Sequence, residues 1–283
     1  MEIQPIKQSN FVSNSSETAK LRTLMNTTPT MPLSALRLIA LSLAFTLFPL
    51  LQVRAGELTA AVAANFAPPF REIAIEFETA TGHNVRVASG SSGNFYSQIK
   101  NGAPFDVFFS ADAERPKLLE DEGLGIKDTR FTYAIGRLVL WSPNENLVKG
   151  EATLRSKQYK RLAMASPKTA PYGVAAMQAM QKLELWDSLQ PHIVTGDSLG
   201  QTMGFIESGN AQLGFVSLSQ VLDPKIKGKG SRWDVPNNLH EPIKQDVIVL
   251  SRAKNNPAAK ALLEFMGGPQ AKTIIKHYGY ELK

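Results

Sequence analysis

Short apolar runs alternate with amphipathic stretches along most of the chain, and this alternation predicts strands followed by helices. Apolar side chains at Phe70, Ile73 and Phe77 share one face of such a helix, and the helix is expected to end at Gly82. Helices are expected at residues 68–81, 94–101, 114–122, 172–183, 199–208, 257–266 and 269–277. Strands are expected at residues 58–63, 84–88, 106–110, 161–165, 192–195 and 213–217. This order indicates an α/β fold in which parallel strands are covered by helices on both faces.

Two extended stretches interrupt the alternation. Residues 131–142 form the first, broken only around Gly136, and residues 244–251 (KQDVIVLS) form the second. We interpret them as two segments that cross between lobes, one leading out and one leading back. The boundaries then predict lobe 1 from residues 56–136 plus 240–283 and lobe 2 from residues 137–239. Residues 225–241, which contain several Gly, Pro and Lys, are expected to form a loop. Two linkers provide a hinge, and a cleft between lobes is a common place for a small-molecule site.

The first 55 residues lack this alternation and are interpreted as a leader that is disordered or removed. A polar stretch precedes Arg37 and an apolar core at residues 38–51. The core has the length of a signal-peptide core and falls short of the ~20 residues of a membrane span. A short buried helix is the alternative. We therefore expect a signal peptide at about residues 31–55 and a periplasmic location. The start codon stays open among Met1, Met25 and Met31.

Composition narrows the classes of partner. The chain has no cysteine, so it has neither disulfides nor a cysteine that could carry a lipid anchor. Its formal net charge is +6, and part of that excess belongs to the leader. The basic run at residues 225–232 is interpreted as a solvated loop. We therefore expect no binding to nucleic acid.

Small or hydrogen-bonding residues stand where four apolar runs give way to helical patterns. The sequences are AAVAANF (60–66), VRVASGSSGNF (85–95), APYG (170–173) and TGDSL (195–199). The first N–H groups of a helix have no intrahelical partner, and the helix dipole adds partial positive charge there. Four such helix starts, two in each lobe, predict a cradle for a small anion.

Motifs for other chemistry are weak in this sequence. Ser97 and Lys100 match S-x-x-K by letters, but no S-D-N or K-T-G follows. The four histidines are scattered without the spacing of metal ligands, and no phosphate-binding loop is present. We therefore predict no catalytic residues and no bound metal cation. A secreted serine hydrolase that uses Ser92 or Ser97 remains an alternative from a different class.

Several longer segments resemble the molybdate-binding proteins of bacterial ABC uptake systems. They are AVAANF (61–66), ASGSSGNFYSQI (88–99), NGAPFDVFFSAD (101–112), SGNAQLGFV (208–216) and GGPQAKTIIKHYGY (267–280). The resemblance extends over residues 56–283. It implies a type II periplasmic-binding-protein fold with two lobes, each a mixed sheet flanked by helices, and two crossing hinge segments.

The resemblance also implies a function and a set of ligand-binding residues. The protein would capture molybdate or tungstate without a cofactor, work as a monomer, and deliver the oxyanion to an ABC permease in the membrane. Carried over by motif, the anion-binding residues are Ala64, Asn65, Ser91, Ser92, Tyr172 and Leu199. Some members hold the anion with a tyrosine where this chain has Ser217, so the hydroxyl role is assigned to Tyr172 and Ser217 is left open.

Physical chemistry supports an oxyanion without reference to the family. A fully deprotonated dianion needs hydrogen-bond donors only, and amide N–H groups with serine and tyrosine hydroxyls provide them. None of the expected site residues is acidic, so hydrogen phosphate, which carries a proton to donate, is disfavoured. Sulfate has the same charge and shape as molybdate, and another oxyanion such as sulfate is the alternative ligand.

Overall fold

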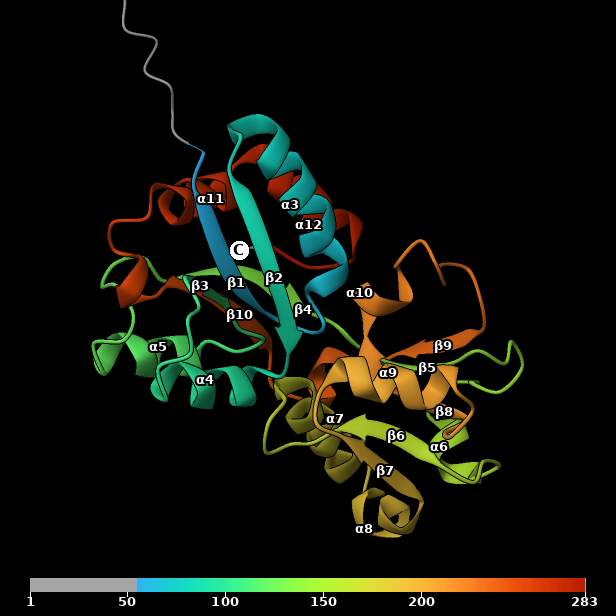
Figure 1. Ribbon diagram of the computed structural model, residues 1–283. Helices are drawn as coiled ribbons and strands as arrows, with labels where there is room; N and C mark the ends of the chain where they lie inside the picture. Colours follow the sequence, from blue (N-terminus) through green and yellow to red (C-terminus); the bar gives the residue numbers. More distant parts are fainter. Residues whose placement is uncertain (1–54, 283) are drawn as a thin grey trace, which may run out of the picture. The chain divides into compact units, whose positions relative to one another are not determined.

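The computed structural model describes residues 55–282, which fold into two five-stranded sheets flanked by helices (Figure 1). The first sheet has the strand order β2-β1-β3-β10-β4. Its strands are β1 (Glu57–Ala63), β2 (Asn84–Gly90), β3 (Val107–Phe109), β4 (Phe131–Gly136) and β10 (Ile243–Val249). The second sheet has the order β7-β6-β8-β5-β9. Its strands are β5 (Leu138–Ser142), β6 (Leu162–Ala165), β7 (Ile193–Gly196), β8 (Leu213–Ser217) and β9 (Ser231–Asp234).

The helices divide between the two sheets, and each sheet with its helices is called a lobe below. The first lobe contains α3 (Ala67–Thr81), α4 (Ser92–Lys100), α5 (Glu114–Asp121), α11 (Pro257–Gly267) and α12 (Pro269–His277). The second lobe contains α6 (Ala152–Ser156), α7 (Pro171–Lys182), α8 (Trp186–Leu189), α9 (Leu199–Glu207) and α10 (Leu218–Val221). Short 3₁₀ turns are η1 (Gln190–His192), η2 (Asn237–Leu239) and η3 (Ser251–Ala253).

Both sheets are mixed. In the first, β1 runs parallel to β2 and β3, whereas β10 runs antiparallel to β3 and β4. In the second, β6 runs parallel to β7 and β8, whereas β5 runs antiparallel to β8 and β9. A register shift between Gln245 and Asp246 marks a bulge in β10. The parallel strands are those followed directly by helices, as the alternating pattern predicts.

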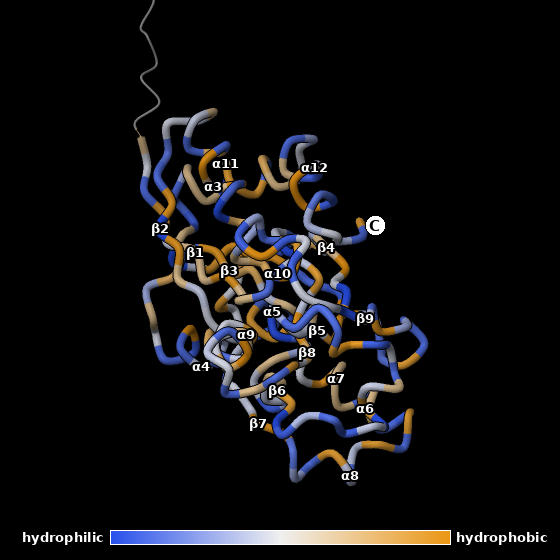
Figure 2. The backbone as a smooth tube through the Cα atoms, turned by 90° about the vertical axis from the view of Figure 1, so that its right-hand side faces the viewer, coloured by the Kyte–Doolittle hydropathy of each residue, from blue (hydrophilic) through white to orange (hydrophobic). Residues whose placement is uncertain are grey.

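Each sheet has an apolar core on both faces, and Figure 2 shows hydrophobic stretches of the tube on both strands and helices. On one face of the first sheet, Phe70 and Ile73 of α3 pack with side chains of α11 and α12. On the other face, Phe95 of α4 packs with residues of α5. In the second sheet α7 covers one face and α9 the other. Burial on both faces explains why these strands read as short continuous apolar runs.

Helix α3 shows how the sequence sets these boundaries. Two prolines stand in its first turn, where their missing N–H groups are not needed. Its buried side chains recur every three or four residues, and Gly82 ends it with a φ of 71°. Only glycine adopts that conformation readily.

The observed architecture confirms the expected two-lobed α/β fold but corrects two details. Residues 225–241 were expected to be a loop, yet they contain β9, which pairs with β5. Residues 244–251 were expected to cross between lobes, but β10 lies entirely within the first sheet. The return crossing runs through residues 235–242, between β9 and β10.

The predicted leader and signal peptide lie outside the described residues, apart from Ala55 at their end. Among residues 55–282, no helix combines the length and the apolar character needed to cross a membrane.

An aromatic cluster around Phe66 generates a stability prediction. Phe66 is fully buried, and its ring centroid lies 4.4 Å from that of Tyr133 and 5.9 Å from that of Phe109. We expect Phe66→Ala to lower the free energy of unfolding by about 3–5 kcal/mol, because it leaves a cavity in the core. Urea denaturation measures this. Ile75 on α3 is 63% exposed, so Ile75→Ala is the control, expected to change stability by no more than ~0.5 kcal/mol. A loss below about 1 kcal/mol for Phe66→Ala would contradict the packing described.

Candidate functional site

Four strand-to-helix turns converge at the carboxyl ends of β1, β2, β6 and β7. They lead into α3, α4, α7 and α9. Ser91 caps α4 by accepting a hydrogen bond from the N–H of Asn94, and Ser198 caps α9 in the same way from Gln201. Pro171 opens α7. These turn residues place the helix starts where the sequence predicted them, at the ends of parallel strands.

A small cavity lies between these turns and takes its lining from both lobes. Its lining includes all six residues expected at the site: Ala64, Asn65, Ser91, Ser92, Tyr172 and Leu199. The other lining residues are Ala63, Gly90, Ala111, Ala170 and Pro171. The room inside for the centre of a water molecule is about 10 Å³. None of the lining residues is charged, and the space, which holds about one water molecule, is too small for a sugar or a peptide.

Each of the four turns contributes to the cavity lining one residue whose backbone N–H group has no partner among the described residues. These residues are Asn65, Ser92, Tyr172 and Leu199. Within residues 55–282, no backbone or side-chain group accepts a hydrogen bond from any of them. Buried N–H groups are normally paired, so four such donors beside one cavity leave room for an acceptor from outside the protein.

Three hydroxyl groups line the same cavity, and each already accepts a hydrogen bond from the protein. Ser91 Oγ accepts from the N–H of Asn94 at 3.3 Å, and Ser92 Oγ accepts from the N–H of Ala111 at 2.8 Å. Tyr172 Oη accepts from Gln245 Nε2 at 3.2 Å. The pKa of Tyr172 also reflects a side-chain hydrogen bond with Tyr280. No described residue accepts from the Ser91 or the Ser92 hydroxyl. Their protons are therefore available to a ligand, and the cavity offers donors in preference to acceptors.

Tyr172 is the largest of these groups and is 1% exposed. Burial raises the pKa of the Tyr172 hydroxyl well above its usual range. The hydroxyl keeps its proton at neutral pH for this reason and acts as a donor. Gly136, at the end of β4, makes space for it, because a Cβ atom there would lie 2.1 Å from Tyr172 Oη.

The Asn65 side chain takes part in a buried hydrogen-bond network beside the cavity. Asn65 Nδ2 donates to Gln245 Oε1 at 2.7 Å and to Tyr280 Oη at 3.0 Å. The carbonyl of Asn65 accepts from Ser219 Oγ at 2.7 Å. Since both amide protons of the side chain are used, the backbone N–H is the donor that Asn65 can offer the cavity. Ser219 belongs to the second lobe, so this network also joins the lobes.

Ser217, whose role the sequence left open, lies outside the cavity lining. Its hydroxyl caps α10 together with Gln220 in a reciprocal capping box. Sequence reasoning also missed Gln245, Tyr133 and Tyr280 of the network. The signal that could have found Gln245 is a polar pair, Gln245 and Asp246, inside an otherwise apolar strand.

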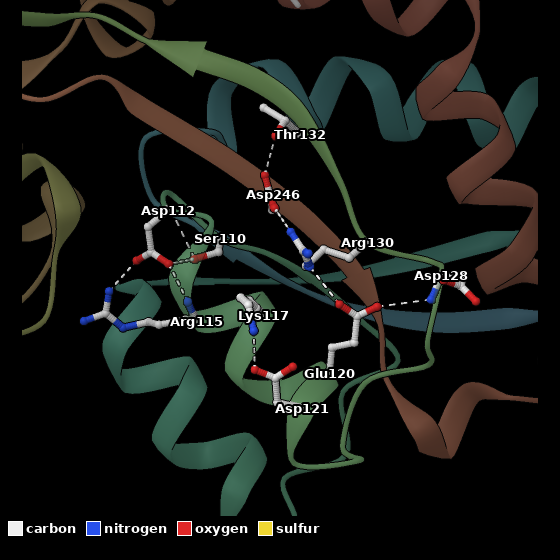
Figure 3. A network of polar contacts seen from close by, with 10 residues as sticks. All are labelled: Ser110, Asp112, Arg115, Lys117, Glu120, Asp121, Asp128, Arg130, Thr132 and Asp246. Carbon is white, nitrogen blue, oxygen red and sulfur yellow. Dashed lines mark hydrogen bonds and ion pairs between the residues drawn. The ribbon is translucent and has the colours of Figure 1, made fainter.

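Two acidic side chains near the site, Asp112 and Asp246, are paired with arginines (Figure 3). Asp112 binds Arg115, and Asp246, which is 1% exposed, binds Arg130 Nη1 at 2.7 Å. Arg130 also binds Glu120 Oε2 at 2.9 Å. These carboxylates are compensated by a neighbouring cation and do not face the cavity lining. No group of three or more acidic or histidine side chains among residues 55–282 is placed to hold a metal ion.

A larger groove of about 300 Å³ lies next to the cavity and shares Ala111 and Pro171 with it. Charged groups of both signs line the groove, including Glu114, Arg115 and Lys244. None of the four residues with unpartnered N–H groups named above lines the groove, so we place the candidate site in the small cavity.

The two lobes touch at the rim of the cavity. The N–H of Gly93 on α4 donates to the carbonyl of Thr169, in the turn before α7, at 2.9 Å. A Cβ atom on Gly93 would lie 3.0 Å from both Cα and the carbonyl oxygen of Thr169. Glycine therefore allows the two backbones to approach each other here.

Comparisons with known proteins agree with this arrangement. The family model for "bacterial extracellular solute-binding protein" matches residues 58–281. The chain is 50% identical over 232 residues to the molybdate-binding protein ModA of Azotobacter vinelandii, covering 81% of this chain and 92% of that protein. It is 47% identical over 245 residues to ModA of Rhodobacter capsulatus, covering 87% and 96%.

The solved structure of the periplasmic molybdate-binding protein of Azotobacter vinelandii matches with a TM-score of 0.77 and 42% identity. The match covers 80% of this chain and 99% of that structure. The resemblance seen in the sequence is thereby confirmed at the level of the family. The chain belongs to the bacterial extracellular solute-binding proteins and, among them, to the family of the molybdate-binding proteins ModA.

Proposed function

We propose that this protein captures molybdate or tungstate in the small cavity between its lobes and delivers it to an ABC permease. The observation that carries the proposal is the cavity between four helix starts, which is uncharged and has hydrogen-bond donors available but no free acidic acceptor. The relatives named above are molybdate-binding proteins. The ligand-binding residues in this proposal are Ala64, Asn65, Ser91, Ser92, Tyr172 and Leu199.

Such a cavity suits a dianion whose oxygens all accept. Backbone N–H groups of Asn65, Ser92 and Leu199 can donate to it, as can the hydroxyls of the two serines and Tyr172. Hydrogen bonds to a charged group contribute about 1.5–3 kcal/mol each. A few of them, combined with the positive ends of helices, account for binding in the sub-micromolar range, which corresponds to more than about 8 kcal/mol.

The same donors discriminate between anions. Hydrogen phosphate carries a proton that needs an acceptor, and leaving such a proton unpaired in a buried site costs about 1–3 kcal/mol. Sulfate has no such proton, so its rejection depends on the dimensions of the cavity. The alternative of a serine hydrolase gains no support from the geometry, because Ser92 Oγ accepts from a backbone N–H and no described base accepts its proton.

Closure of the lobes connects binding to transport. The hydrogen bond from Gly93 to Thr169 joins the lobes directly at the cavity rim. A ligand that binds both halves stabilises this closed arrangement, and a permease can distinguish it from the open one. In this proposal the protein acts as a monomer in the periplasm, without a cofactor and without nucleic acid.

Titration calorimetry of the mature protein with molybdate, tungstate, sulfate and phosphate tests the ligand. We expect dissociation constants below about 1 μM for molybdate and tungstate and much weaker binding of the other two. Tight binding of sulfate or phosphate alone would refute the assignment.

Removing one donor tests the site. Ser92→Ala deletes a hydroxyl that faces the cavity, and we expect molybdate binding to weaken by about 1–3 kcal/mol, or roughly 5- to 150-fold. Ser97 lies on the same helix and is exposed, so Ser97→Ala is the matched control and leaves the affinity unchanged. Melting temperatures of both variants show whether the fold is retained. An unaltered affinity in folded Ser92→Ala removes this residue from the site.

Crowding the lobe contact tests closure. Gly93→Ala places a methyl group against the backbone of Thr169, and such overpacking costs about 1–3 kcal/mol. Because the clash exists only when the lobes are closed, we expect weaker molybdate binding and faster dissociation with little change in the stability of the unliganded protein. Gly204 on α9 has open space around its Cβ position, so Gly204→Ala is the control. Equal affinities of the two variants would argue against closure at this contact.

A further inference from the structure

Gln245 lies beside the cavity, fully buried on β10, and does not line it. Its Oε1 accepts from Asn65 Nδ2 at 2.7 Å and from Tyr133 Oη at 3.1 Å. The contact with Asn65 is the shorter of the two, and the Tyr133 hydroxyl also donates to the carbonyl of Ser110, at 3.0 Å. The other end of the Gln245 amide, Nε2, faces Tyr172.

The orientation of this amide decides what Tyr172 can offer a ligand. Gln245 Nε2 donates to Tyr172 Oη at 3.2 Å. The tyrosine oxygen thus accepts a hydrogen bond from inside the protein. Tyr172 also lines the cavity. Its O–H can then donate to a ligand, whereas its ability to accept from one is reduced.

The two serine hydroxyls accept their hydrogen bonds from a different kind of donor. Ser91 Oγ and Ser92 Oγ accept from backbone N–H groups, of Asn94 and Ala111, which no side-chain substitution removes. Tyr172 depends on a side chain instead. Among the three hydroxyls of the cavity, it is the one whose donor character a single substitution can change.

We propose that Gln245 is a positioning residue that holds the Tyr172 hydroxyl as a donor, and that it thereby makes the cavity discriminate against oxyanions that still carry a proton. This inference rests on the proposed function. Without the amide of Gln245, the Tyr172 hydroxyl can rotate and accept a proton from hydrogen phosphate. The discrimination then falls, although Gln245 touches no ligand.

The experiment compares the ratio of the molybdate and phosphate dissociation constants in the full mature protein. Gln245→Met keeps the length of the side chain and removes its donor. We expect the ratio to shift toward phosphate by about tenfold or more, the equivalent of one unpaired buried proton. In a Tyr172→Phe background, the same Gln245→Met change should leave the ratio unaltered, because the hydroxyl through which it acts is absent.

Two further variants separate positioning from general loss of stability. Ser219→Ala removes a hydroxyl from the same buried network that has no hydrogen bond to Tyr172, so it is expected to lower stability without shifting the ratio. Gln245→Glu keeps the acceptor toward Asn65 and, when ionised, lacks the donor toward Tyr172. Its charge repels both dianions and largely cancels in the ratio, which should shift as in Gln245→Met. It serves in place of Gln245→Met if that variant does not fold.

The outcomes distinguish this inference from the proposed function. If the wild-type protein binds neither molybdate nor tungstate, the proposed function fails and the inference with it. If the wild type binds molybdate but the ratio is unchanged in the Gln245 variants, the inference alone is overturned. The same conclusion follows if Ser219→Ala shifts the ratio equally, or if the shift persists in the Tyr172→Phe background.

Discussion

The rest of the structure depends on one feature: a small uncharged cavity whose polar groups have protons to donate in hydrogen bonds. Ser91 and Ser92 each accept a bond from a backbone N–H, which leaves their own protons for a ligand, and Tyr172 accepts a bond from Gln245. Helix starts from both lobes add N–H groups that the fold does not satisfy. Unpaired donors in a buried place are unfavourable unless an acceptor arrives. An oxyanion stabilises the closed protein by providing those acceptors, and binding and closure are therefore coupled.

The fold produces this arrangement by repeating one unit, a strand followed by a turn and a helix. In each lobe two parallel strands end at the cavity, and each is followed by a turn and a helix. Small side chains such as Ala64 and Gly90 let the backbone approach the cavity, while Gly93 and Gly136 allow the close contacts that bring the halves and Tyr172 together. The carboxylates of Asp112 and Asp246 near the site are paired with Arg115 and Arg130, which compensates their negative charge toward a dianion.

Much of this could be predicted from the sequence because the signals are local. The spacing of Phe70, Ile73 and Phe77 defines α3, and the turn residues mark the helix starts. Strand β9 escaped prediction because it is a half-exposed edge strand whose structure depends on pairing with β5. Gln245 escaped for a related reason. Its partners Asn65, Tyr133 and Tyr172 are 180, 112 and 73 residues away in the sequence, and no local pattern reveals their juxtaposition.

The central claim is that an uncharged set of donors between the lobes holds the oxyanion, and the position of the metal atom tests it most directly. Crystals grown with molybdate, measured at the molybdenum absorption edge, give that position from anomalous scattering. The account predicts one strong peak in the small cavity, with the anion oxygens facing Ser92 Oγ, Tyr172 Oη and the helix-start N–H groups. A peak in the neighbouring charged groove, or a carboxylate in contact with the anion, would contradict it.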